Sequence, residues 1–487
     1  MTRQVSVGRW QTIAVVVPPL AYAVYCLALM PPGPVTAPDS AGYLAFAPIH
    51  LLGYVSFLRV FGATGAMVAQ PVLFSIALAW LGLETLRLTS SVWLAIAVVV
   101  APMVVPDLRT YHYSILTESL FMSCLVAFLA GVVAFVREPS VRRLVVVSTL
   151  ASFAAIIRSP GLALLVVVPV MTLMHWRRLP VRRIVLVVAG LAPVIAIAGG
   201  ERAAARAIHG DRMTSLMGRD LFAKAALIDA APPATPSSDP EQAQLERDLD
   251  ERYASMRMLL AQASPAVQAI LSLYYETCLE GPCVPQIGTT DATVAPKGVN
   301  DALARVGFAR LARAPLGYIG LTMREYRSLW TAFRLRDPGT VPLLNAFIEQ
   351  HRPLPFEQLV FKVGAADRIA FEPSRPVRLL QPAVISIGWL TGVFALVGLL
   401  SAAVRRPLSP ALAVTCLVSL AAHSAVLFYA LAAAGIGRYM LGLWPAVTTA
   451  GLFGGWWLVT LVRDVGDAGR LRHQDLHLEQ LDERLGP

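Results

Sequence analysis

Long apolar segments separated by short polar turns dominate this chain. Because a helix of about 20 apolar residues crosses a bilayer, the pattern predicts about ten membrane-spanning helices. Two of them form a hairpin over residues 144–175, which breaks at Arg158-Ser159-Pro160-Gly161. The chain is therefore expected to fold as a mostly α-helical, polytopic membrane bundle. The other predicted spans are residues 10–30, 66–82, 91–106, 115–136, 184–200, 379–402, 410–434 and 438–462.

A long polar interval divides these spans into two groups. The expected units are an N-terminal membrane module at residues 1–200, a polar unit at 201–377, a C-terminal membrane module at 378–463 and a tail at 464–487. The middle unit is too polar to span and is expected to be an interrupted, α-rich extracytoplasmic domain. Within it, residues 315–333 predict an amphipathic helix, which either lies on the bilayer or packs on the unit's own core.

Composition and charge agree with a membrane protein. Hydrophobic residues make up 56% of the chain and charged residues 15%, whereas a soluble domain carries about 25% charged residues. The net charge of +10 does not indicate a nucleic-acid partner, because the basic residues lie in short turns and in the mixed-charge polar unit. Arginine-rich turns occupy alternate connections, which predicts that these turns and both termini are cytoplasmic. The turns contain Arg87, Arg137, Arg142, Arg143, Arg177, Arg178, Arg182, Arg183, Arg405 and Arg406.

The five cysteines fall into two groups. Cys26, Cys124 and Cys416 lie inside predicted spans and are expected to pack as small apolar residues. Cys278 and Cys283 lie in the polar unit, where an oxidising compartment would let them pair. No histidine or third cysteine lies near that pair in sequence, so the spacing does not indicate a zinc site.

Two acids in neighbouring outer connections are the candidate catalytic residues. Asp39 follows the first span in Pro38-Asp39-Ser40-Ala41-Gly42-Tyr43, and Glu118 stands just inside the fourth span after Thr117. Asp39 could act as a general base, bind a metal or cap the next helix, and Glu118 could be a first-turn acid behind a Thr117 cap. Two acids at one depth favour a site. Candidate substrate-binding residues in these connections are Tyr43, Asp107, Arg109 and His112.

Two arginines near apolar segments provide the complementary charge. Arg158 breaks the hydrophobic hairpin, and Arg438 opens the last span together with Tyr439. A guanidinium binds phosphate through paired, charge-assisted hydrogen bonds, which favours a lipid-linked phosphate as the ligand. The alternative is that each arginine extends to the membrane surface without a ligand.

Four short motifs together resemble the GT-C superfamily of integral membrane glycosyltransferases. They are Pro-Asp-Ser-x-x-Tyr at 38–43, Leu-Thr-Glu-Ser-Leu-Phe at 116–121, Arg-Ser-Pro-Gly at 158–161 and Arg-Tyr-Met at 438–440. The chain looks most like the bacterial relatives of the protein mannosyltransferase and lipid A aminoarabinose transferase group. In architecture this resemblance covers nearly the whole chain.

The resemblance implies a GT-C-like fold in the bacterial inner membrane, with the active site on the extracytoplasmic face. It implies inverting transfer of a sugar from a polyprenyl-phosphate donor to a glycan, lipid or other envelope acceptor. Asp39 matches the first-loop catalytic acid, Glu118 the second-loop acid, and Arg158 and Arg438 the phosphate-binding role. Many protein mannosyltransferases have Asp-Glu where this chain has Asp39-Ser40, which disfavours a protein acceptor and leaves a divalent-metal requirement open.

Three other functions fit parts of the pattern. A polysaccharide polymerase or ligase would use the same lipid-linked donor and an outward site. A transporter would place its charged residues near the membrane midplane and show two related halves, whereas the charges here cluster toward one face. A non-catalytic assembly or lipid-binding protein would need none of the candidate catalytic residues.

Overall fold

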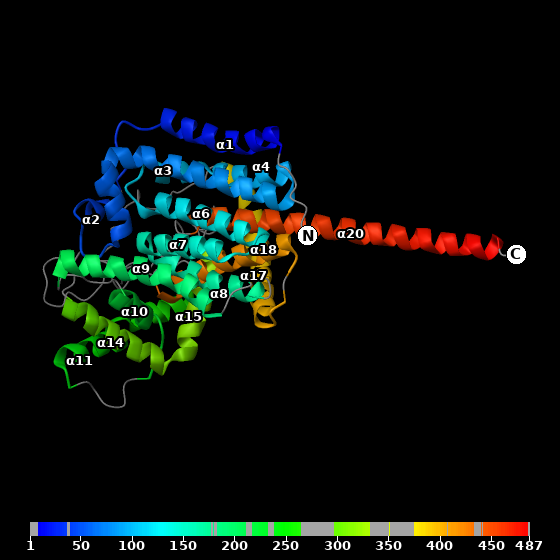
Figure 1. Ribbon diagram of the computed structural model, residues 1–487. Helices are drawn as coiled ribbons and strands as arrows, with labels where there is room; N and C mark the ends of the chain where they lie inside the picture. The colour runs from blue at the N-terminus through cyan, green and yellow to red at the C-terminus, as the bar shows by residue number, and fades with distance from the viewer. Residues whose placement is uncertain are drawn as a thin grey trace.

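The chain forms a bundle of helices with a smaller helical unit beside it (Figure 1). The computed structural model describes residues 8–36, 39–176, 179, 183–210, 217–231, 238–263, 297–331, 350, 375–406, 408–432, 440 and 442–485. These residues form helices and one isolated bridge, between Val35 and Ser114, and no strand. The predicted mostly α-helical class is confirmed. The helices are α1 (Arg9–Ala28), α2 (Ser40–Leu44), α3 (Leu52–Thr89), α4 (Val92–Met103), α5 (Pro106–Tyr113), α6 (Thr117–Arg137), α7 (Val141–Ile157), η1 (Ser159–Val166), α8 (Val167–Met174), α9 (Arg183–His209), α10 (Met217–Ala226), α11 (Pro240–Arg247), η4 (Asp248–Arg252), α12 (Ala254–Gln262), α14 (Lys297–Arg313), α15 (Pro315–Thr331), α17 (Arg375–Ala403), α18 (Pro410–Ala432) and α20 (Trp444–Leu485).

Seven of the described helices are long and apolar enough to cross a membrane, namely α1, α3, α6, α9, α17, α18 and α20. Two more apolar segments are shorter: α4, and the run from Ser159 to Met174 that holds η1 and α8. These lengths support a polytopic membrane protein. The count of about ten spans and the GT-C-like arrangement stay predictions.

The second span is longer than the sequence pattern predicts. Instead of covering only residues 66–82, α3 begins at Leu52 and bends at Gly62, where φ is +68°. Glycine adopts this backbone conformation without a steric penalty. Before the bend, Tyr54 and Val55 are buried, although Arg59 interrupts the apolar run. The bend therefore hides the first part of the helix from a search for continuous apolar residues.

Helix α6 lies at the centre of the bundle. It packs against α3, α7, α18 and α20, and the side chains of Phe121, Phe128 and Phe135 are all buried. A helix that is apolar on every side is expected to be enclosed by other helices. The first turn of α6, which contains Glu118, is therefore fixed by packing on most of its sides.

The tip of the predicted hairpin is held in a tight turn. α7 ends at Ile157, and Arg158 separates it from η1. A Cβ atom on Gly161 would lie 2.2 Å from the backbone carbonyl carbon of Ala154, so only glycine allows η1 to approach α7 this closely. The Gly161 amide also donates a hydrogen bond to the Arg158 carbonyl oxygen at 2.9 Å. Local geometry thus holds the backbone of Arg158 in place.

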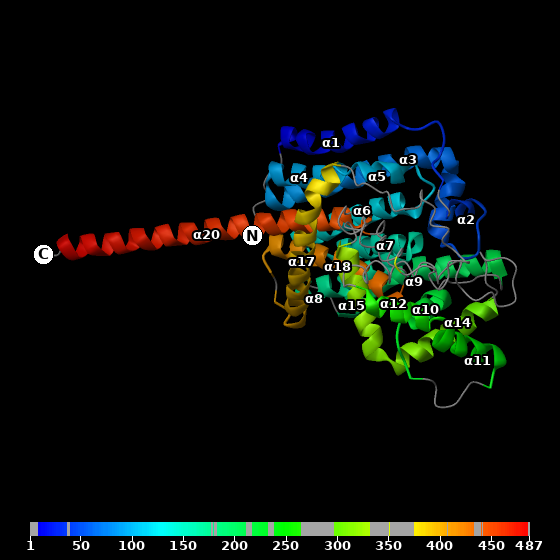
Figure 2. The ribbon, with the colours of Figure 1, turned by 180° about the vertical axis from the view of Figure 1, so that it is seen from behind.

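Arginine-rich turns meet at one end of the bundle. Arg87 and Arg137 lie 2.5 and 3.0 Å from the two carboxylate oxygens of the buried Glu84, which joins the end of α3 to the end of α6. Arg405 lies over the ring of Trp176, 5.9 Å from its centroid. Helix α20 projects from the bundle at this end (Figures 1 and 2). The cytoplasmic location of this end stays a prediction.

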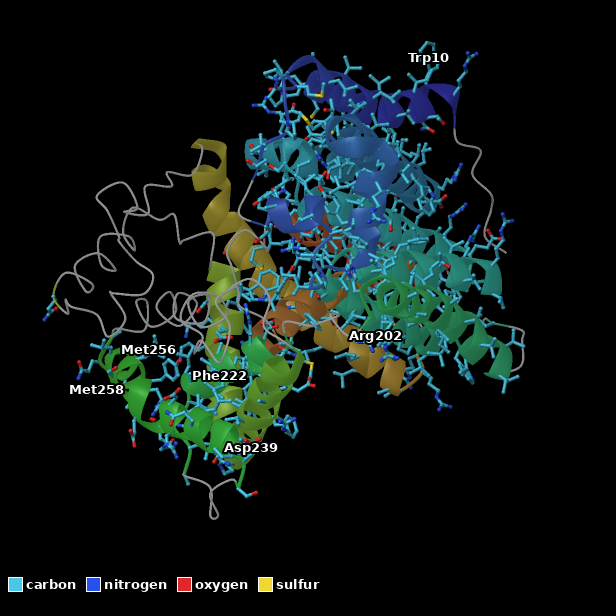
Figure 3. All side chains as sticks on the ribbon, turned by 90° about the vertical axis from the view of Figure 1, so that its left-hand side faces the viewer. Trp10, Arg202, Phe222, Asp239, Met256 and Met258 are labelled. Atoms are coloured by element: carbon cyan, nitrogen blue, oxygen red, sulfur yellow. The ribbon has the colours of Figure 1, made fainter. Side chains whose placement is uncertain are left out.

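The polar unit has a small core of its own, formed mainly by α10, α12, η4 and α14. Phe222 and Met256 point into this core, whereas Met258 lies on its surface (Figure 3). At 2.6 Å, the fully buried ion pair between Lys224 and Glu325 ties α10 to α15. The preceding helix α9 continues past residue 200 to His209, whose ring lies 4.5 Å from that of Phe46, so the first residues after 200 still pack beside the bundle.

Candidate active site

Backbone hydrogen bonds join the segment between α1 and α2 to the segment between α5 and α6. The Val35 amide donates to the Tyr113 carbonyl oxygen at 2.9 Å, and the Ile115 amide donates back to the Val35 carbonyl oxygen at 3.0 Å. The buried Ser40 hydroxyl donates to the Ile115 carbonyl oxygen at 2.9 Å. These contacts place α2, which follows Asp39, beside the start of α6. Segments that are far apart in sequence therefore meet at this end of the bundle.

Glu118 and Arg158 form an ion pair where α6 begins and the hairpin turns. Arg158 Nη1 lies 3.0 Å from Glu118 Oε1, and the two side chains are 11% and 2% exposed. Thr117 Oγ1 accepts a hydrogen bond from Arg158 Nη1 at 3.3 Å and donates one to Glu118 Oε2 at 3.4 Å. The three residues form a compact polar cluster within otherwise apolar packing.

Tyr43 and Asp39 complete this cluster from α2 and the residue before it. Burial raises the pKa of Tyr43 to about 12, with the Arg158 cation opposing the shift and Glu118 and Asp39 adding to it. The Tyr43 side chain also hydrogen-bonds Thr117. Three of the residues predicted from sequence, Asp39, Glu118 and Arg158, are thus each close enough to Tyr43 to influence its pKa.

Side-chain capping hydrogen bonds do not account for the positions of Asp39 and Thr117. Asp39 occupies the residue before α2, but its side chain makes no capping hydrogen bond. Thr117 is already inside α6, whose N-cap position is Leu116. Glu118 lies in the first turn of α6, where the helix dipole favours an acid. Asp39 thus occupies the predicted N-cap position without a side-chain hydrogen bond to the helix, whereas the capping interpretation is wrong for Thr117. The first-turn interpretation of Glu118 is compatible with its ion pair.

His50 belongs to the same cluster, although sequence reasoning did not identify it. Its ring lies against that of Tyr43, with the centroids 4.0 Å apart. Burial lowers the pKa of His50, and the nearby Asp39 carboxylate opposes that shift. A Cβ atom on Gly42 would lie 2.2 Å from His50 Nε2, so the glycine in the first motif leaves room for this ring. A lone histidine in an apolar stretch gave no signal of that contact.

Arg109 and His112 make their contacts elsewhere. Arg109 Nη1 donates to the Tyr25 hydroxyl at 2.8 Å, at the end of α1. His112 is fully buried, and its Nδ1 lies 2.7 Å from Ser119 Oγ. The ring of His112 also packs against Tyr22 and Phe74. These contacts join α5 to α1, α3 and α6, and the predicted substrate-binding roles of both residues remain predictions.

Several other predicted positions have no structural account. The side chain of Asp107 lies outside the described residues, as do Arg438, Tyr439, Cys278 and Cys283. Cys26, Cys124 and Cys416 are free thiols. Across the part of the chain that the structure describes, no group of three or more histidine, cysteine, aspartate or glutamate side chains could hold a metal ion.

Comparison with known proteins identifies no relative of this chain. No protein-family model, curated protein or solved structure matches the chain. The functional argument therefore depends on the residues of the cluster and on their chemistry.

Proposed function

We propose that the chain is a membrane glycosyltransferase that moves a sugar from a polyprenyl-phosphate donor to an extracytoplasmic glycan, lipid or envelope acceptor. The observation that carries this proposal is the cluster of Asp39, Tyr43, Glu118 and Arg158 at one end of the bundle. It combines a carboxylate that can accept a proton with a guanidinium that can bind a phosphate. Inverting sugar transfer from a lipid phosphate needs both groups.

In this proposal Arg158 binds the donor phosphate. A guanidinium is a strong phosphate ligand because its planar fork forms paired, charge-assisted hydrogen bonds. Glu118 and Thr117 hold the Arg158 side chain through contacts of 3.0 and 3.3 Å to Nη1. Glu118 therefore acts as a positioning residue for the arginine. Fixing the cation before the reaction favours stabilisation of charge that develops on the leaving phosphate.

Asp39 acts as the general base. It takes the proton of the acceptor hydroxyl, whose oxygen attacks the anomeric carbon of the sugar from the side opposite the phosphate. The new glycosidic bond forms as the bond between the anomeric carbon and the phosphate oxygen breaks. Polyprenyl phosphate leaves with the electron pair of that bond, and the configuration of the anomeric carbon inverts. Asp39 is only partly buried, which suits a group that must meet an incoming hydroxyl.

The position of the cluster suits a donor with a lipid tail. Glu118 lies in the first turn of a helix of membrane-spanning length, and Arg158 lies at the tip of an apolar hairpin. A polyprenyl chain can reach such helix ends laterally through the bilayer, so its phosphate arrives at the level of the cluster. A transporter would need its charged residues near the middle of the spans instead.

Lipid extracts from a strain that lacks this protein test the proposal. We expect one polyprenyl-phosphate sugar to accumulate, and we expect the wild-type gene to restore its normal level. A gene carrying Asp39→Asn should not restore it, even though the variant protein is present in the membrane at the normal amount. Unchanged lipid-linked sugars in the deletion strain would rule out this donor class.

A further inference from the structure

Helix α15 of the polar unit runs along the membrane-length helix α18. The Tyr318 hydroxyl donates to the Leu431 carbonyl oxygen at 2.7 Å. About two turns further along α15, the Tyr326 hydroxyl contacts His423 Nδ1. The ring of Trp330 lies 4.5 Å from that of His423. Residue numbers rise along α15 as they fall along α18, so the two helices lie side by side and antiparallel.

One face of α15 is packed against protein. Leu321 and Leu329 are buried on this face, and Trp330 is buried at the C-terminal end of the helix. The ring of Trp330 occupies the space beside Gly388 of α17, where a Cβ atom would lie 2.5 Å from it. Glu325 points to the polar unit and pairs with Lys224 at 2.6 Å. This face therefore fixes α15 between the bundle and the polar unit.

Over the first turns of α15, an apolar face is exposed. Toward the C-terminal end of the helix the same stripe is covered, because Tyr326 and Trp330 follow Ile319 and Met323 at helical spacing and pack against His423. Leu316, Ile319 and Met323 are 82%, 57% and 54% exposed, and they recur at the spacing of one helix face. Gly320, on the same face, has no atom within 4 Å of the position of a Cβ. Large apolar side chains gathered on one exposed face usually mark a surface that contacts a partner or a membrane.

This face continues onto the surface of a helix of membrane-spanning length. On α18, Leu427 and Leu431 are 39% and 37% exposed beside the contacts with α15, and on α14 Phe308 is 66% exposed. Arg313 precedes the apolar face, at the C-terminal end of α14. An apolar face that continues the surface of a membrane-length helix, with a cation at its outer end, fits a bilayer whose headgroups lie above the hydrocarbon.

We propose that the outer face of α15 contacts lipid, so that the polar unit enters the membrane surface through this helix. Leu316, Ile319 and Met323 meet the hydrocarbon beside α18, and Arg313 lies toward the lipid phosphates. This inference does not depend on the proposed glycosyltransferase activity.

Spin labels on the full-length protein in lipid nanodiscs test the proposal. Nitroxide labels are attached to Ile319→Cys and Met323→Cys, with Leu316→Cys as a replacement on the same face if either variant fails to fold. Arg305→Cys, on the exposed surface of α14, provides the water reference. Ile76→Cys, which is 58% exposed in the long helix α3, provides the lipid reference. Wild-type protein treated in the same way gives the background from the chain's own cysteines.

The readout is the ratio of the label's collision rates with oxygen, which concentrates in lipid, and with a nickel chelate, which stays in water. We expect the ratio on α15 to be several-fold above that at Arg305 and close to that at Ile76. A ratio equal to the water reference would overturn the proposal. So would low collision rates with both reagents, which would mean that protein covers this face, and spin–spin broadening would identify that protein as a second copy.

Discussion

Arg158 and Glu118 hold each other at the meeting point of two helices, with Arg158 Nη1 3.0 Å from Glu118 Oε1 and both side chains nearly closed to solvent. Charges attract more strongly in such surroundings than in water, but each must also have lost its hydration. Stability alone therefore does not explain why this acid and this cation are buried here. Positioning of the cation for a phosphate ligand is the reason that we propose.

Breaking this pair should destabilise the protein more than breaking a surface pair. Glu118→Gln leaves Arg158 without its buried counter-charge, which we expect to cost about 3–5 kcal/mol. The double variant Glu118→Gln with Arg158→Gln should regain much of that stability but no transfer activity. Thermal unfolding in detergent and a transfer assay provide the two measurements.

Glu138→Gln provides the matched control. Glu138 pairs with Arg143 at 2.6 Å but is 68% exposed, and such a pair contributes about 0–1 kcal/mol. Wild-type stability together with normal transfer in Glu118→Gln would remove the ion pair from the account.

Asp39→Asn should abolish sugar transfer without unfolding the protein. The carboxamide keeps the shape of the side chain but cannot accept the acceptor's proton, and loss of a general base typically slows a reaction by about 100- to 10,000-fold. Turnover by the purified variant, together with its melting temperature, measures both expectations. Asp301→Asn, at an exposed position of α14, should change neither. Near-normal turnover in Asp39→Asn would mean that another group is the base.

Protonation of His50 should lower the transfer activity at acidic pH. Because burial lowers the pKa of His50 below 6.5, the ring is neutral at pH 7 and takes up a proton only as the pH falls through that lower pKa. The resulting cation beside Asp39 would reduce the basicity of the carboxylate. We therefore expect transfer to decline below pH 6.5 in the wild type. His50→Phe keeps a ring against Tyr43 and should lose this part of the decline, whereas identical pH profiles would leave His50 with a packing role.

Reporter fusions should locate the two ends of the bundle. A reporter fused after Pro236 should be extracytoplasmic, and reporters fused after Arg182 or Arg406 should be cytoplasmic, because arginine-rich turns are retained inside. Alkaline phosphatase and green fluorescent protein fusions distinguish the two sides. A cytoplasmic signal after Pro236 would put the cluster of Asp39 and Glu118 on the wrong face for the proposed donor.

Apolar patterning predicts the helices well where a span is continuous. The α6 and α18 helices agree with the predicted spans at 115–136 and 410–434. The start of α3 was missed because Gly62 and Arg59 interrupt its apolar run, although packing against neighbouring helices still buries Tyr54 and Val55. Periodicity reports what a helix buries but not where the backbone bends.

For the candidate site, the sequence predicted several of the residues but not how they meet. Asp39, Glu118 and Arg158 stand out because charge next to apolar segments is costly and therefore conspicuous. Their meeting point depends on hydrogen bonds between distant connections, such as that from Ser40 to Ile115, which sequence spacing does not encode. His50 could not be predicted from the sequence, because its contact with Tyr43 exists only in the folded chain.

Binding of polyprenyl phosphate tests the central claim most directly, because it requires the two arginines predicted to bind the phosphate, Arg158 and Arg438, and not the full reaction. The measurement compares detergent-purified wild type with Arg158→Lys and Arg438→Lys, and uses Arg143→Lys at the opposite end of the bundle as the control. Lysine keeps the charge but loses the planar fork, and losing one charge-assisted contact costs about 1.5–3 kcal/mol. We predict that both site variants bind about 10- to 150-fold more weakly, with Arg143→Lys unchanged. Equal affinity in all four proteins, or no binding to the wild type, would contradict the account.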